Sequence, residues 1–220
     1  DALPIFRLAE DVELMQTMQI SFNSATFARR ELASVDAVPD RDTLLLKALE
    51  RVPPDGLVCE FGVYKGHTLR IIANALKSRP VYGFDSFTGL PEAWRPGFDK
   101  GSFKVDATKL RFPENVKLYP GLFHATLPAM LAEDARNTAF LHIDCDLYSS
   151  TKCVFDALSC RLQAGTVIVF DEYFNFPGWE NDEHRALAEA ARDAGFAYEY
   201  ILYNPRGQQV AIVVSEVRNT

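Results

Sequence analysis

Two apolar segments that each contain an acid near their end constrain the fold of this chain most. Residues 57–61 form an apolar run around Glu60, and Gly62 and Gly66 follow it; a second apolar run ends in Asp85. An apolar run, a glycine-containing turn, a helix and a second apolar run are typical of a βαβ unit. The acid that ends the second strand of such a unit can accept hydrogen bonds from ribose hydroxyls. The pattern therefore predicts an α/β fold that binds a nucleoside.

The first turn narrows the choice of nucleoside. A dinucleotide site needs G-x-G-x-x-G, because the backbone must closely approach a pyrophosphate. Here Glu60 replaces the first glycine, and its carboxylate would repel a phosphate. An acid suits a ligand with a cationic end, such as the amino group and sulfonium of S-adenosylmethionine, while Gly62 and Gly66 let the backbone lie close to it. An ordinary turn with an incidental glutamate is the alternative, and Asp85 argues against it.

Composition and charge restrict the partners. The chain has 220 residues and a net charge of −7, which argues against a nucleic-acid partner, since that requires a basic surface. No apolar run is long enough to cross a bilayer, and we expect no membrane partner. Cys153 and Cys160 lie two turns apart on one predicted helix, about 10 Å and too far for a disulfide. With Cys59 and Cys145 also lacking metal spacing, we expect reduced thiols and a cytoplasmic location.

The sequence predicts a single domain overall, in which a helical N-terminal extension over residues 1–55 packs on a ligand-binding domain over residues 56–220. After residue 56, apolar runs and helical patterns alternate. Residues 86–105 form a long loop with several glycines and prolines, and we expect a lid over the site. The predicted strands are 57–61, 81–85, 116–119, 139–144, 166–170, 197–203 and 209–214.

The last two predicted strands have only Pro205, Arg206, Gly207 and a few neighbours between them, too short for a helical crossover. They must therefore form an antiparallel hairpin. The sequence predicts a three-layer, Rossmann-like α/β fold whose seven-stranded sheet is mostly parallel, with one antiparallel strand in its edge region. Such a sheet resembles that of class I methyltransferases.

Four acids follow two of the later strands. Asp144 and Asp146 come after one strand, and Asp171 and Glu172 come after the next. Ligands of such sheets bind outside the carboxyl ends of the strands, so these carboxylates are expected to converge there. Clustered carboxylates repel one another unless one is protonated or a cation lies between them, which favours a hard divalent ion such as Mg²⁺. The alternatives are a helix-capping role for Asp146 and a solvated strand end at residues 171–172.

Two of the four histidines fall near this region. His184, at the start of a helix after the acidic strand end, is a candidate general base, with a surface or capping histidine as the alternative. His67 is expected at a helix start beside the ligand. We interpret His142 as a core histidine and give His124 no role.

Several motifs resemble the macrocin O-methyltransferase family, which methylates sugar hydroxyls in antibiotic biosynthesis. They are E-F-G-V-Y-K-G-H-T (60–68), G-F-D-S-F-T-G-L-P-E (83–92), G-L-F-H-A-T-L-P (121–128), H-I-D-C-D-L-Y-S-S-T (142–151) and F-D-E-Y (170–173). The resemblance implies a divalent metal on Asp144, Asp171 and Glu172, although the family usually has Asp at the last position. It also implies S-adenosylmethionine binding through Glu60, Gly62, Gly66, Thr68, Asp85, Ser86 and Asp144.

The sequence thus predicts an S-adenosylmethionine-dependent O-methyltransferase for a small-molecule hydroxyl, on a sugar or a phenol. Asp144, His184 or a bound metal would take up the hydroxyl proton. A nicotinamide-dependent oxidoreductase and a non-catalytic S-adenosylmethionine-binding module are the alternatives. Because family members are often oligomeric, the resemblance also allows for a homo-oligomer.

Overall fold

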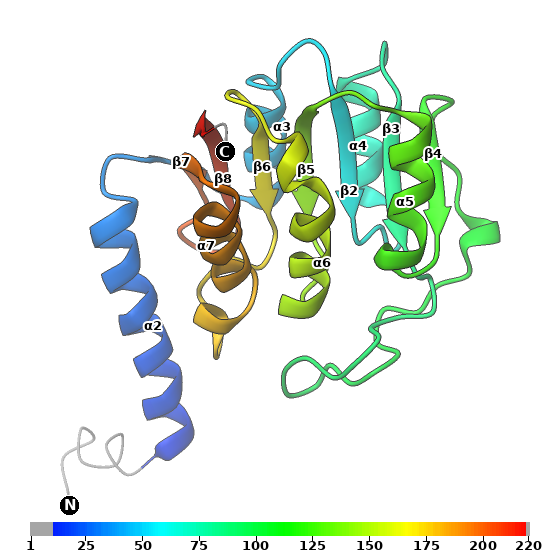
Figure 1. Ribbon diagram of the computed structural model, residues 1–220. Helices are drawn as coiled ribbons and strands as arrows, with labels where there is room; N and C mark the ends of the chain where they lie inside the picture. Colours follow the sequence, from blue (N-terminus) through cyan, green and yellow to red (C-terminus); the bar gives the residue numbers. More distant parts are fainter. Residues whose placement is uncertain (1–10, 219–220) are drawn as a thin grey trace, which may run out of the picture.

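The computed structural model describes residues 11–218 and has three layers, with one twisted sheet between two layers of helices (Figure 1). The strand order is β1-β7-β8-β6-β5-β2-β3-β4. The strands are β1 (Asp36–Ala37), β2 (Leu57–Phe61), β3 (Val81–Asp85), β4 (Val116–Pro120), β5 (Thr138–Ile143), β6 (Val167–Phe170), β7 (Phe196–Tyr203) and β8 (Val210–Val217). The helices are α2 (Val12–Glu31), α3 (Arg41–Leu49), α4 (His67–Ala75), α5 (Phe123–Glu133), α6 (Tyr148–Leu158) and α7 (Glu183–Ala194).

The sheet confirms the predicted fold class but has eight strands rather than seven. The additional strand, β1, is two residues long and pairs in parallel with β7. A strand this short carries no alternation of apolar residues that a sequence could reveal. β8 is antiparallel to both β6 and β7, which confirms the hairpin and places the antiparallel strand just inside the sheet edge.

Alternation along the strands divides the core into two clusters. Leu57 and Phe61 of β2 and Leu141 of β5 belong to the cluster under α5, α6 and α7. Val58 of β2 and Phe140 of β5 pack in the other cluster, with α3 and α4. Since successive side chains of a strand point to opposite faces, even-numbered residues of β2 and β5 face α3 and α4.

The N-terminal segment contacts the sheet through two different helices. α2 projects from the body in Figure 1, and only Ser24 and Phe27 of this helix are buried. α3 packs against α4 and buries Leu44 and Leu45 in the core. The division of the chain at residue 55 stays a prediction, and its first ten residues lie outside the described part. Within residues 11–218, no helix has both the length and the apolar character that a bilayer crossing requires.

Candidate active site at the carboxyl ends of the strands

A cavity of about 640 Å³ opens at the carboxyl ends of the parallel strands. Its volume falls in the range of small-molecule sites, and its position is where doubly wound sheets bind ligands. Residues that directly follow five strand ends line it: Gly62, Ser86, Gly121, Leu122, Asp144, Cys145, Asp146, Asp171 and Glu172, together with Asp85 at the end of β3.

Gly62 brings the ends of β2 and β5 into contact. Its φ of +94° is a conformation that side-chain-bearing residues rarely adopt, and a Cβ there would lie 1.6 Å from the carbonyl oxygen of Asp144. The N–H of Asp144 donates a 2.8 Å hydrogen bond to the carbonyl oxygen of Phe61, which fixes Asp144 beside the turn. The glycine is therefore required by the close approach of two backbones as well as by its dihedral angle.

Asp85 organises the turn between β2 and α4. Its Oδ2 accepts hydrogen bonds from the backbone N–H groups of Val63 (2.8 Å) and Tyr64 (2.7 Å), and its Oδ1 accepts one from Phe87 (2.6 Å). A carboxylate offers about four acceptor positions. Backbone N–H groups use three of these positions, which leaves one. Because Asp85 lines the cavity, that position is available to a ligand hydroxyl.

Glu60 lies below the cavity rather than in its wall. The side chain is fully buried, its Oε1 accepts a 3.0 Å hydrogen bond from the hydroxyl of Thr68, and its Oε2 lies 3.3 Å from Nδ1 of His142. Burial raises the pKa of Glu60, and the neighbouring His142 acts in the opposite direction. Neither Glu60 nor Thr68 is among the cavity residues, and Gly66 backs onto the ring of Phe112.

The predicted cofactor contacts therefore divide into two groups. Gly62, Asp85, Ser86 and Asp144 line the cavity. Glu60 is buried and is not among the residues that line the cavity, so the direct contact between Glu60 and a cationic ligand stays a prediction. The sequence identified an acid at this strand end without showing to which side of the sheet it points.

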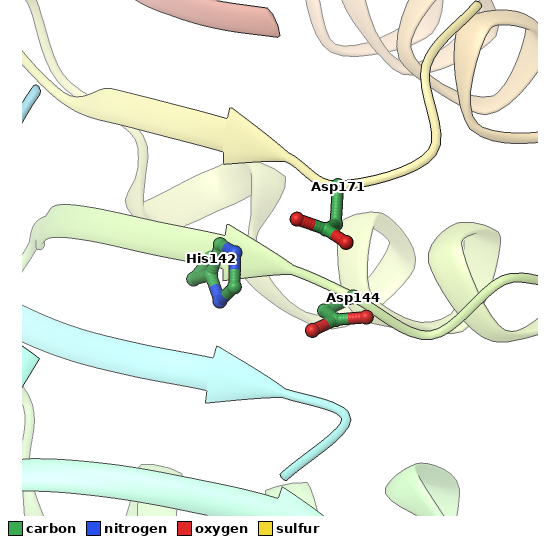
Figure 2. A group of neighbouring side chains, drawn as sticks. All are labelled: His142, Asp144 and Asp171. Carbon is green, nitrogen blue, oxygen red and sulfur yellow. The ribbon is translucent and has the colours of Figure 1, made fainter. Parts of the chain in front are cut away.

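The predicted acid cluster forms, with one change in membership. His142, Asp144 and Asp171 each have a ligand atom within 4.8 Å of a ligand atom of the other two. Figure 2 shows the three side chains at the ends of their strands. Glu172 lies outside this tight group, although its carboxylate also lines the cavity. The pKa values of Asp144 and Glu172 are both well above their usual range. Burial away from water is the main cause, and repulsion from the nearby carboxylate of Asp171 is the second.

The cluster fits a divalent cation. Oδ1 of Asp171 and Oε2 of Glu172 are buried and lack a hydrogen-bond partner among residues 11–218. Oδ2 of Asp171 lies 3.5 Å from Nη1 of Arg41, a cation of α3 in the cavity wall. Buried unpartnered carboxylate oxygens are costly unless a cation or proton is present. Asp144, Asp171 and their neighbours are thus chemically suited to hold a metal ion.

Asp146 does not cap the following helix. α6 begins after Leu147 with no side-chain cap, and Asp146 has a φ of +65° that turns it into the cavity wall. Burial raises the pKa of Asp146 to about 7, and Arg95 acts in the opposite direction. The capping alternative is therefore wrong, and Asp146 is a further acid of the site.

His184 is not among the residues that line the cavity. Its ring packs against Phe27, Tyr173 and Trp179, with ring centroids 5.0–5.6 Å apart. Burial lowers the pKa of His184 from its ordinary value. His184 lies in the first turn of α7, and its ring contacts Phe27 of α2. This position argues against the general-base role, because the ring packs between two helices and not in the cavity.

The cavity also has walls that sequence reasoning missed. Arg41 comes from the N-terminal segment, and His124 lies on the other side, in the first turn of α5. β4 pairs in parallel with β3, so its carboxyl end lies at the same edge of the sheet. A prediction that β4 belongs to the parallel sheet would therefore have placed the residues after it, His124 included, in the cavity wall. Nothing in the pattern near Arg41 indicates that it reaches acids more than 100 residues away.

The loop of residues 86–105 covers part of the cavity, as expected of a lid. Leu90 and Phe103 line the cavity from this loop. The indole N–H of Trp94 donates a 3.1 Å hydrogen bond to Asp182, and the hydroxyl of Ser149 donates one of 2.5 Å to Glu92. These contacts hold the loop against α6 and the start of α7.

Comparison with known proteins agrees with this architecture. A protein family described as a methyltransferase domain matches residues 59–173. Demethyldecarbamoylnovobiocin O-methyltransferase of Streptomyces niveus is 27% identical over 165 residues, which are 64% of this chain and 61% of that protein. The chain thus matches less than two thirds of the length of this relative.

Two solved structures show the same fold. The calicheamicin methyltransferase CalS11 aligns with a TM-score of 0.62 and 23% identity, over 97% of this chain and 86% of that one. The O-methyltransferase NovP aligns with a TM-score of 0.61 and 24% identity, over 80% of each chain. Both similarities extend well beyond the glycine-containing turn.

Proposed function

The chain belongs to the methyltransferase-domain family, and we propose that it transfers a methyl group from S-adenosylmethionine to a hydroxyl of a small molecule. One observation carries this proposal: a single cavity is bounded by Asp85, at the position that receives ribose hydroxyls, and by the acids around Asp144. Donor and acceptor can therefore meet inside one cavity. The ends of β2 and β3 would hold the donor, and the ends of β5 and β6 would face the acceptor.

The residues of the chain would mainly position the two reactants. Holding them in line and close together supplies much of the rate of a direct displacement. When bound, S-adenosylmethionine supplies an activated methyl group on a sulfonium. Asp144 is the carboxylate proposed to take the hydroxyl proton, since it lines the cavity at the junction of the two halves. The lid of residues 86–105 would exclude water.

A divalent cation, with Mg²⁺ as the ion predicted from sequence, is proposed on Asp144 and Asp171, with Glu172 as the predicted third ligand. Such an ion would lower the pKa of an acceptor hydroxyl. The support for it is the pair of buried carboxylate oxygens on Asp171 and Glu172 that no described residue pairs with. His184 has no part in this proposal, because it does not line the cavity.

The macrocin O-methyltransferase group is the subfamily that we propose, on the motifs of residues 60–68 and 142–151. Sugar or phenolic hydroxyls are the corresponding acceptor class, and one similar structure, CalS11, is described as a TDP-rhamnose 3'-O-methyltransferase of calicheamicin biosynthesis. A cytoplasmic location and a homo-oligomer stay predictions. The exposed apolar side chains of α2, which are Val12, Met15, Met18 and Phe22, would form the surface for a second copy.

Transfer of a labelled methyl group to a panel of sugars, nucleotide sugars and phenols tests this proposal. We expect label in at least one hydroxyl-bearing acceptor, and loss of most turnover in Asp144→Asn with donor binding retained. Donor binding without transfer to any acceptor would instead favour the non-catalytic module. Unchanged turnover in Asp144→Asn would remove Asp144 from the mechanism.

A further inference from the structure

A line of buried polar side chains runs from the interior of the protein to the acid cluster. Glu60 of β2 is the register partner of His142 of β5, and both belong to the strand face that α3 and α4 cover. Asp144 follows His142 by two residues, and Asp171 follows the last strand residue of neighbouring β6. The line therefore ends at the cavity, where both aspartates contribute to the wall.

His142 is the unexplained member of this line. Its side chain is fully buried, and neither ring nitrogen has a hydrogen-bond partner in the described part of the chain. An imidazole carries at least one N–H and, when neutral, one lone pair, so burying both nitrogens without partners is unfavourable. Nδ1 lies 3.3 Å from Oε2 of Glu60, which leaves Nε2 for another partner.

The two aspartates supply the other side of the arrangement. A ring nitrogen of His142 and one carboxylate oxygen each from Asp144 and Asp171 lie within 4.8 Å of one another (Figure 2). Oδ2 of Asp171 faces Arg41, whereas its Oδ1 is buried without a partner among residues 11–218. Asp171 therefore has one oxygen to offer, as a monodentate ligand would.

We propose that His142 is a metal ligand together with Asp144 and Asp171, and that Glu60 is the carboxylate that orients its ring. Metal-binding histidines commonly donate their second N–H to a carboxylate, which sets the tautomer and strengthens the ligand. Oε2 of Glu60 lies 3.3 Å from Nδ1 of His142, which places a carboxylate where such an orienting partner would lie. Glu60 is then a positioning residue for the metal site rather than a contact of the methyl donor.

The nitrogen ligand determines which ion the site prefers. Imidazole suits transition metals, whereas Mg²⁺ is bound by oxygen ligands and water. A set of one imidazole and two carboxylates therefore favours a first-row transition-metal ion over Mg²⁺, and Mn²⁺, which also accepts oxygen ligands, serves as the paramagnetic probe of this site. This inference deepens the metal part of the proposed function and rests on it, but the site can be tested without any methyl donor.

The test is pulsed electron paramagnetic resonance of Mn²⁺ bound to the full chain, with S-adenosylmethionine absent. We expect a ¹⁴N coupling from a directly bound imidazole, lost in His142→Gln and retained in His124→Gln, the matched variant of another cavity histidine. Glu60→Gln is expected to weaken Mn²⁺ affinity about 10–100-fold, as losses of orienting partners do. In competition, Mg²⁺ should displace Mn²⁺ only at large excess.

Bound Mn²⁺ without a ¹⁴N coupling would overturn the assignment, as would a coupling that survives in His142→Gln. Absence of Mn²⁺ binding at millimolar concentration would overturn it as well. Where His142→Gln does not fold, by circular dichroism, the wild-type coupling and the Glu60→Gln affinity decide. Binding of S-adenosylhomocysteine in EDTA reports separately on the donor site, so loss of one proposal leaves the other standing.

Discussion

Substitution of Gly62 tests the geometry on which the whole site depends. A Cβ at this position would lie 1.6 Å from the carbonyl oxygen of Asp144. Because nonbonded heavy atoms rest about 3.5 Å apart, Gly62→Ala must separate the ends of β2 and β5 by more than about 1.5 Å. Asp144, which follows β5 directly, would move with its strand end.

The expected cost follows from these contacts. A positive φ costs alanine about 1–2 kcal/mol. Displacement of the strand end also breaks the hydrogen bonds from the N–H of Asp144 to Phe61 and from the N–H of Asp171 to Ile143, worth about 1 kcal/mol each. We therefore expect Gly62→Ala to lose about 3–4 kcal/mol of unfolding free energy, or about 10 °C in Tm.

Gly97→Ala is the matched control, since Gly97 has a φ of +91° and a methyl group added there would meet no atom of the described residues within 4 Å. It should lose only the dihedral cost of about 1–2 kcal/mol. Urea unfolding of both variants gives the comparison, and donor binding should weaken in Gly62→Ala alone. Equal stability losses in the two variants would refute the idea that two backbones meet at Gly62.

Three further substitutions test other parts of the structure. Asp85→Ala should lower the unfolding free energy by about 3 kcal/mol, because three backbone N–H groups lose their acceptor, and calorimetry should show donor binding abolished. Phe27→Ala should cost about 3 kcal/mol and raise hydrogen exchange in α2 alone, since this ring is the main buried contact of that helix. Tyr82 donates a 2.8 Å hydrogen bond to Asp134. Burial is the larger cause, and this hydrogen bond the second, of a shift that raises the pKa of Tyr82 to about 12. Because this folded-state pKa lies above the ordinary value of about 10, the contribution is full below pH 10 and is lost as the pH rises toward 12; Tyr82→Phe should remove that part of the alkaline destabilisation in urea titrations.

The fold could be predicted because its signals are local. Buried parallel strands appear as continuous apolar runs, and the short connection after Tyr203 permits only a hairpin. Convergence of Asp144 and Asp171 followed from one assumption, that their strands are neighbours, and β5 and β6 do pair in parallel. The two-residue strand β1 could not be predicted, because its pairing depends on where β7 lies.

The sequence did not reveal the directions in which several side chains of the site point, because these directions depend on the face of the strand or helix that each residue occupies. His142 was interpreted as a core histidine because its neighbours in sequence are apolar, and it is indeed buried, yet it lies beside two aspartates. Glu60 is predicted to contact a ligand, and it is buried on the face of β2 that, by alternation with Val58, is covered by α3 and α4. His184 follows an acidic strand end in sequence, but its helix turns the ring toward α2. None of these directions can be read from spacing alone.

Calorimetric titration of the full chain with S-adenosylhomocysteine tests the central claim most directly. We predict binding in the micromolar range at one site per chain, in EDTA as well as with Mn²⁺. We also predict that Asp85→Ala abolishes this binding, whereas Cys160→Ala, an exposed position outside the cavity, leaves it unchanged. Absence of binding at millimolar ligand would contradict the assignment of this cavity to a methyl donor.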